Sequence, residues 1–238
     1  MRYGFSAATT RSFDDRAYHW SLPSGHTCFG AEKCLASADR HTGKITNGAR
    51  QEYRCYSAVM ERFSGVRAKY WANYEAVKNM PVDVVAAILK GALPRDATVV
   101  RAHVAGDFFS QAYFDGWLQL ARSRPSVRFY AFTKSLPLWT KRQNEVPSNF
   151  VLTASYGGKY DAMIATHKLK SARVVNTEAE AAALGLRIDH DDSLAADGDE
   201  SFALLLIPHG KQRLVPLTIA LADEAMGDAA ASEAARGS

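Results

Sequence analysis

The three cysteines of this chain, Cys28, Cys34 and Cys55, follow one another closely with the spacing C-x5-C-x20-C. Three cysteines placed at random would cluster this tightly only on the order of a few per cent of the time. An odd number leaves one thiol without a disulfide partner, and structural disulfides are rare in the cytosol. Buried structural cysteines, the ordinary alternative, usually lie among apolar residues. The sequence neighbours of Cys28 and Cys34 instead include Gly25 and Lys33. The spacing therefore predicts a metal centre.

Two kinds of metal centre are open to these cysteines. Zinc would need a fourth ligand such as His26 or His41 to complete a closed Cys3His tetrahedron, although paired cysteines two to four residues apart are absent. An iron–sulfur cluster accepts three thiolates at longer spacing. Three thiolates would leave one iron of a [4Fe–4S] cluster open to water or a small ligand, and an oxidant would then leave a [3Fe–4S] form. We expect the cluster.

Alternating signals for strands and helices run through the middle of the chain and predict βαβ units with a parallel sheet and right-handed crossovers. The expected strands are 17–22, 98–104, 127–133, 150–155, 172–176 and 202–207. The expected helices are 56–77 with a break at 64–65, 81–93, 110–124, 137–144, a helix ending near 169, and 178–184. Six strands suit an incomplete parallel (β/α)6 TIM-like barrel or an open doubly wound sheet, and the pattern alone does not choose.

The chain as a whole has the composition of one folded domain, with 238 residues of which 47% are hydrophobic and 23% charged. No apolar run approaches the ~18–20 residues that span a bilayer, and the first five residues have no apolar signal core. We expect one domain over 1–238, in the cytoplasm and away from membranes. From about 225 the Ala-rich end is expected to be a helix that frays, within a segment that begins near 222.

Charge is distributed unevenly around a formal net charge of +4. Between 40 and 78 there are eight Lys or Arg and three acids, which could face a phosphate-bearing partner or form a solvated helix face. Residues 189–200 hold six acids and no base, and are expected to form a solvated loop, as are residues 35–50. An apolar stripe recurs at helical spacing and is expected to be core. Its members are Tyr56, Met60, Phe63, Tyr70, Tyr74 and Val77.

Polar side chains stand where the predicted strands end, and functional groups of a parallel barrel gather at that edge. Alternation places Arg101 and His103 on one face, pointing inward if helices cover the outside, with Asp107 just above them. The cofactor-binding candidates are Arg101, His103, Gly106, Asp107, Lys134 and Ser155, with Ser135 and Thr153 beside them. This ring suits a small polar or anionic ligand near the open iron, or a satisfied buried network. The glycines at 157–158 could bind an anion through their N–H groups.

Several uncommon strings occur in one order over about residues 18–160, and together they resemble the gene product 88 family of actinobacteriophages. They are residues 20–31, Cys34, 55–58, 101–110 and 129–136. The resemblance implies a bacteriophage protein that acts in the host cytoplasm. It implies little about activity.

More distantly, the layout resembles the radical S-adenosylmethionine superfamily, whose incomplete (β/α)6 barrel carries a [4Fe–4S] cluster on three cysteines after the first strand. Gly106-Asp107 stands after the second long strand, where that superfamily carries a Gly-Glu motif for the methionine amino group. The compact C-x3-C-x2-C of the superfamily is replaced here, so the resemblance implies the cluster more directly than S-adenosylmethionine. The expected function is the binding of an iron–sulfur cluster with an open iron, with no reaction assigned; an enzyme of this kind would be radical-forming or aconitase-like. The alternative is a cluster- or zinc-braced regulatory protein that contacts a host protein or nucleic acid without catalysis.

Overall fold

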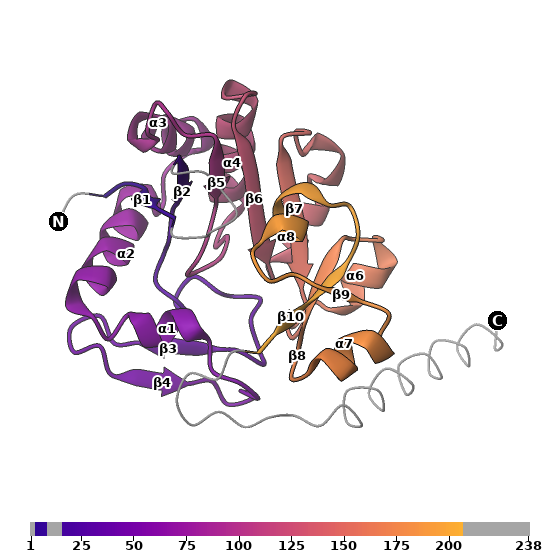
Figure 1. Cartoon of the computed structure of the whole chain (residues 1–238). Helices are drawn as coiled ribbons and strands as arrows, with labels where there is room; N and C mark the ends of the chain where they lie inside the picture. The colour runs from indigo at the N-terminus through magenta and orange to yellow at the C-terminus, as the bar shows by residue number, and fades with distance from the viewer. Residues whose placement is uncertain (1–2, 9–15, 207–238) are drawn as a thin grey trace, which may run out of the picture.

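The computed structural model describes residues 3–8 and 16–206, and these form one mixed α/β domain around an eight-stranded sheet (Figure 1). In spatial order the strands are β1 (Ser6–Ala7), β2 (Ala17–His19), β5 (Val99–Arg101), β6 (Arg128–Thr133), β7 (Phe150–Ser155), β8 (Ser171–Val175), β10 (Phe202–Leu205) and β9 (Arg187–Ile188). Every pairing from β2 to β9 is parallel, and only β1 runs antiparallel, against β2. The expected tail from about 225 lies outside the described residues.

The sheet is mostly parallel, as the alternating pattern predicts, but it is not closed. Its edges are β1 and β9, and neither strand pairs with the other. Six strands, from β2 to β10, follow one another in chain order, with β9 lying outside that series. The carboxyl ends of these parallel strands therefore meet at one edge of the sheet, where the cysteine-bearing segments also lie.

The helices fall mostly where the sequence predicts them, because their boundaries carry local signals. They are α1 (Tyr56–Met60), α2 (Ser64–Val77), α3 (Val82–Ala92), α4 (Gln111–Ser123), α5 (Leu136–Thr140), α6 (Ala162–Thr166), α7 (Glu178–Ala183) and α8 (Ser193–Asp197). Ser110 caps α4 by accepting a hydrogen bond from the N–H of Tyr113, and Thr177 caps α7 in the same way. None of the helices in the described segments has the length and apolar character needed to cross a membrane.

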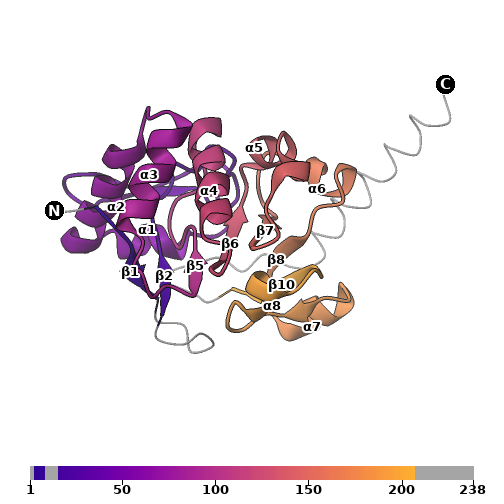
Figure 2. The same ribbon diagram turned by 90° about the horizontal axis from the view of Figure 1, so that it is seen from above.

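One face of the sheet is covered by α3 and α4, as the view from above shows (Figure 2). Alternate residues of the strands, such as Val100, Phe129 and Leu152, point into this core and meet Trp117 of α4. Gly116 lets α4 approach α3 closely, since a Cβ there would lie 2.5 Å from the Cγ1 of Val85.

The opposite face is covered by α8, which lies on the other side of the strands in Figure 2. Strand order explains this position. The chain passes from β8 to β9 and then returns, so that β10 lies between them. A right-handed connection that runs backward along a sheet places its helix on the other face. Residues 189–200 were expected to be a loop, and that prediction is wrong for the part that forms α8.

A two-stranded hairpin, β3 (Ala36–Ala38) and β4 (Ile45–Asn47), occupies the segment that was expected to be a loop. The strands have three residues each and few β-branched side chains, so they give little signal. The predicted turn at Thr42-Gly43 is present, because Asp39 accepts hydrogen bonds from the N–H groups of His41 and Thr42. The hairpin packs against α1.

The apolar stripe at 56–77 divides into two parts. Tyr70 and Val77 on α2 are buried, as expected. Tyr56, Met60 and Phe63 are exposed, so their assignment to the core is wrong. The break lies at 61–63, just before the expected position at 64–65, because α1 ends at Met60 and α2 begins at Ser64.

Candidate metal centre

The loop after β2 carries Cys28 and is held at the carboxyl edge of the sheet. The N–H of Leu22 donates to the carbonyl of Ala105 at 2.9 Å, which ties the loop to the segment after β5. Both the N–H and the hydroxyl of Thr27 donate to the carbonyl of Pro23, so the chain turns back on itself just before Cys28. The N–H of Gly25 points at the Cys28 sulfur, with an N–Sγ distance of 3.4 Å.

Cys34 and Cys55 reach the same edge from two further segments. The N–H of Lys33 donates to the carbonyl of Gly157 at 2.9 Å, and the N–H of Glu52 donates to the carbonyl of Lys33 at 2.8 Å. The first bond fixes Cys34 against the loop after β7, and the second brings the chain before Cys55 alongside it. Cys55 directly precedes α1.

The three cysteines lie close enough together for their charges to interact. Burial, followed by the negative charges of Asp107, Cys55 and Cys34, raises the pKa of Cys28 well above its usual range. Burial raises the pKa of Cys34 to about 11, Lys134 opposes that shift, and Cys55 adds to it. All three cysteines are half-buried as residues, and none forms a disulfide. The structure therefore brings together residues that lie as much as 27 positions apart in the sequence.

Within residues 3–8 and 16–206, no group of three or more histidine, cysteine, aspartate or glutamate side chains could hold a metal ion. His26, a candidate fourth ligand, packs its ring against Trp71 and Tyr74 of α2, at centroid distances of 4.7 and 4.8 Å. His41 is exposed in the turn of the β3–β4 hairpin.

Asp107 lies near the cysteines, and both of its carboxylate oxygens accept hydrogen bonds from other residues of the chain. Its Oδ1 accepts the hydroxyl of Thr133 at 2.6 Å and the N–H of Phe108 at 2.7 Å, and its Oδ2 accepts the N–H of Lys134 at 2.8 Å. Burial raises the pKa of Asp107, while these hydrogen bonds oppose the rise. Gly106 has φ +80°, and a Cβ there would lie 2.6 Å from the hydroxyl of Thr27, so this position requires glycine.

Lys134 is a buried cation near the cysteines. Its side chain is turned toward the loop after β7, where the Nζ donates to the Ser155 carbonyl at 2.9 Å, to the Ser155 hydroxyl at 2.7 Å and to the carbonyl of Tyr156. No carboxylate in the described segments forms an ion pair with it. Its charge instead acts on Cys34. Asp107 and Lys134 therefore lie near enough to the cysteines for their charges to act on them, and Ser155 accepts a hydrogen bond from Lys134.

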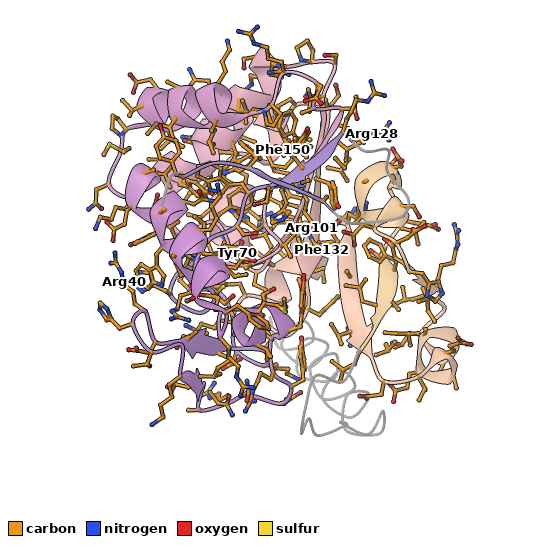
Figure 3. The ribbon with its side chains drawn as sticks, turned by 60° about the vertical axis from the view of Figure 1, so that its left-hand side comes forward. Arg40, Tyr70, Arg101, Arg128, Phe132 and Phe150 are labelled. Atoms are coloured by element: carbon orange, nitrogen blue, oxygen red, sulfur yellow. The ribbon has the colours of Figure 1, made fainter. Side chains whose placement is uncertain are left out.

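Arg101 points to the face of the sheet that α8 covers. Its guanidinium donates to Asp192 Oδ2 at 2.6 Å, and the hydroxyl of Tyr130 donates to the same oxygen at 2.9 Å. Figure 3 shows Arg101 beside Phe132, and the guanidinium carbon lies 5.0 Å from the centre of that ring. The guanidinium of Arg101 therefore already forms an ion pair with a carboxylate of the chain itself.

His103 points the other way, so the prediction that it shares a face with Arg101 is wrong. Its Nε2 lies 3.1 Å from the hydroxyl of Tyr113 on α4, and its ring contacts Phe108 and Trp117. Burial, and then the charge of Arg101, lowers its pKa to about 3. The physical reason is that β5 ends at Arg101, so strand alternation does not continue to His103.

The glycines at 157–158 do donate their N–H groups to an anion, but the anion belongs to the chain. Gly157 and Gly158 bond the two carboxylate oxygens of Asp161 at 2.8 and 2.9 Å. Thr153 is buried, and its hydroxyl has no hydrogen-bond partner among the described residues. Ser135 is also buried at the start of α5.

Tyr53 also belongs to this region, and no sequence motif pointed to it. Burial first, and then the charges of Cys34 and Cys55, raise its pKa, so its phenol lies near both cysteines. It also lines a cavity of about 120 Å³, whose wall includes Lys33, Tyr156, Asp161 and Arg173. The cavity lies beside the cysteine region, and position 53, two residues before Cys55, was the one available hint.

Comparison with known proteins gives a family for the chain. The model of the family described as gene product 88 matches residues 5–231, which is nearly the whole sequence. Neither the curated proteins nor the solved structures contain a match to this chain. The match covers every cysteine, every predicted site residue and the sheet that positions them. The chain belongs to the gene product 88 family.

Proposed function

We propose that this protein binds an iron–sulfur cluster through Cys28, Cys34 and Cys55, with one iron left open to a small ligand. The observation that carries the proposal is the gathering of the only three cysteines of the chain at the carboxyl edge of a parallel sheet. Three separate segments must fold to bring these thiols together. Parallel α/β folds place their functional groups at this edge.

A cluster suits this arrangement better than zinc does. A zinc ion draws its ligands to about 2.3 Å, so the sulfurs of one site lie roughly 3.8 Å apart. The thiolates of a cluster bind different irons and are spread more widely. Of the two candidate fourth ligands for zinc, His26 packs its ring against Trp71 and Tyr74, and His41 is exposed in the hairpin turn.

The surrounding charges also suit a cluster, because three thiolates on a [4Fe–4S] core give it net negative charge. Lys134 supplies a buried cation that no carboxylate in the described residues neutralises. The N–H of Gly25 can donate to a cluster-bound sulfur at Cys28, a contact that tunes reduction potential. The cavity beside Tyr53 and Lys33 offers space for a small polar or anionic ligand.

The six strands from β2 to β10 in chain order support the comparison with an open (β/α)6 barrel. S-adenosylmethionine, however, would need the carboxylate of Asp107 for its amino group. Both oxygens of Asp107 already accept hydrogen bonds from Thr133, Phe108 and Lys134. We therefore expect a smaller ligand at the open iron, and Arg101, paired with Asp192, to stay apart from it.

Anaerobic purification followed by iron, sulfide and zinc analysis tests the proposal. We expect a brown protein with equal amounts of iron and acid-labile sulfide, and loss of the visible absorption in Cys28→Ala, Cys34→Ala and Cys55→Ala. His26→Ala and His41→Ala are the matched controls from the same segments and should keep the chromophore. Stoichiometric zinc without sulfide, retained by the wild type and lost in a histidine variant, would favour the zinc-braced alternative and contradict the cluster.

A further inference from the structure

Helix α1 presents large apolar side chains to solvent. Five large apolar side chains of the described residues are exposed, and three of them belong to this helix or lie just beyond it. Tyr56 is 40% exposed, Met60 is 43% exposed, and Phe63, which follows the end of the helix, is 62% exposed. Their spacing of four and three residues is that of neighbours on one helical side. We call Tyr56, Met60 and Phe63 the α1 face, and this grouping indicates an interaction surface.

The size of the α1 face limits what can bind it. Stable interfaces between separate proteins involve about 20–30 residues on each side. A segment of the same chain needs far less contact, because a short tether holds it near the surface at an effective concentration on the order of millimolar. A surface of three side chains therefore suits a short apolar segment of this chain better than it suits a second protein or a second copy.

One short apolar segment follows the described part of the chain. Within residues 214–221 the only polar side chain is Thr218. The large apolar side chains of this segment are Leu214, Val215, Leu217, Ile219 and Leu221. The family match runs to residue 231 and so includes the segment. Because transfer of such side chains from water to an apolar surface is favourable, we expect the segment to bind an apolar surface within its reach.

The described chain ends beside the residues that lead into α1 (Figure 1). Leu206, its last residue, lines the same cavity of about 120 Å³ as Glu52 and Tyr53. Tyr53 precedes Tyr56 by three positions, which is at most about 11 Å of extended chain. Residues 207–213, which connect Leu206 to the apolar segment, can span up to about 25 Å. The connection is therefore long enough to bring the segment onto the α1 face.

We propose that residues 214–221 bind the α1 face of their own chain. To reach it, residues 207–213 must pass the mouth of the cavity, because Leu206 and Tyr53 both belong to its wall. The bound segment would lie against the backbone next to Cys55, which directly precedes the α1 face. The end of the chain would thus form one side of the site at the carboxyl edge of the sheet. This contact does not require a cluster at the cysteines.

Hydrogen–deuterium exchange of the full chain, followed by mass spectrometry of short peptides, tests this contact. We expect the amides of residues 214–221 to exchange at least about tenfold more slowly than those of a free peptide with the same sequence. Phe63→Glu places a charge in the α1 face and should return this exchange to the free-peptide rate. Leu217→Glu, on the other partner, should have the same effect.

Met80→Glu is the matched control, since Met80 is also exposed but lies between α2 and α3. It should leave the protection of residues 214–221 unchanged. Slow exchange of the amides of β6 and β7, equal in all variants, shows that the fold is intact. Phe63 is 62% exposed, so its replacement should not unfold the chain.

Three results would overturn the contact. The first is exchange of residues 214–221 at the free-peptide rate in the wild type. The second is protection that Phe63→Glu leaves unchanged, which would mean that the segment binds another surface. The third is protection that disappears on dilution together with a dimer seen by sedimentation, which would mean that the segment binds a second copy. The iron and sulfide content decides none of these results, so the contact and the cluster can fail separately.

Discussion

At the scale of single residues, Glu61 places a carboxyl group in the interior near the cysteine segments. Its side chain is buried, one carboxylate oxygen accepts the N–H of Ser24 at 2.7 Å, and the other has no partner among the described residues. Burial raises its pKa from 4.5 to about 7, although Ser24 and Arg67 oppose the rise. The folded chain therefore keeps a proton there that the unfolded chain loses.

This proton makes stability depend on pH in a direction that can be tested. The contribution of Glu61 to the free energy of unfolding is present in full below pH 4.5 and is lost as the pH rises toward 7. The slope reaches at most about 1.4 kcal/mol per pH unit. We expect Glu61→Gln to remove this loss, so that the variant gains stability relative to wild type as the pH rises from 4.5 to 7.

Urea unfolding at several pH values measures the difference between the two proteins. Taking the difference removes the opposing contribution of His103, whose lowered pKa is common to both. Glu178→Gln, at an exposed position on α7, is the control and should follow the wild type. A constant difference between Glu61→Gln and wild type across the range would contradict the raised pKa.

At the scale of elements, the cysteine loop depends on one close contact with the end of β6. A Cβ on Gly30 would lie 2.1 Å from the carbonyl oxygen of Lys134. The loop is bonded further along as well, because Ala31 forms a bridge with Gly158. Backbone on both sides leaves no flexible side chain that could move aside.

We expect Gly30→Ala to displace the loop, to lower the free energy of unfolding by about 1–3 kcal/mol, and to reduce the iron and sulfide content sharply. Gly91→Ala is the control, because a Cβ at that position of α3 meets nothing within 4 Å. It should instead stabilise the helix by about 0.5–1 kcal/mol. Denaturant unfolding and metal analysis give both readouts, and an unchanged Gly30→Ala would disprove the contact.

Elements with local signals were predictable from the sequence, and elements set by distant contacts were not. Ser110 and Thr177 mark helix starts because their side chains bond the next turn of the same helix. The exposed part of the apolar stripe was not predictable, because periodicity records which residues share a face without saying what covers it. His103 was misplaced because the end of β5 depends on pairing with β2 and β6.

The candidate site was predictable in part for the same reason. The positions of Asp107 and Lys134 near the cysteines follow from parallel strands, whose carboxyl ends share one edge. The ion pair between Arg101 and Asp192 was not predictable, since these residues lie 91 positions apart. Asp161, in contrast, lies only three and four positions from the glycines whose N–H groups its carboxylate accepts.

At the scale of the whole molecule, one buried ion pair joins the early and late parts of the sheet. Arg101 on β5 and Asp192 before α8 are both largely buried, with side-chain exposures of 18% and 14%. Asp192 has a left-handed backbone at φ 66°, a conformation that asparagine also tolerates. An uncompensated guanidinium at this position is costly.

Asp192→Asn removes the charge and keeps the shape, so we expect it to lower the free energy of unfolding by about 3 kcal/mol. Asp197→Asn is the control at the other end of α8, where Asp197 pairs with Arg128 at the surface, and it should cost less than about 1 kcal/mol. Chemical denaturation compares the two. Equal losses would show that α8 is held by its apolar contacts alone.

The return of the chain between β8 and β9 has a consequence during synthesis. Among the described strands β9 pairs only with β10, which is made later and must enter between two strands that are already translated. At about 5–20 residues per second, the interval from Ile188 to Phe202 lasts on the order of a second or more. Throughout it the edge of β8 is unpaired, and an unpaired apolar edge recruits strands from other chains. The edge of β8 therefore stays open to misassembly until the last described strand emerges, and chaperone demand should rise over this interval.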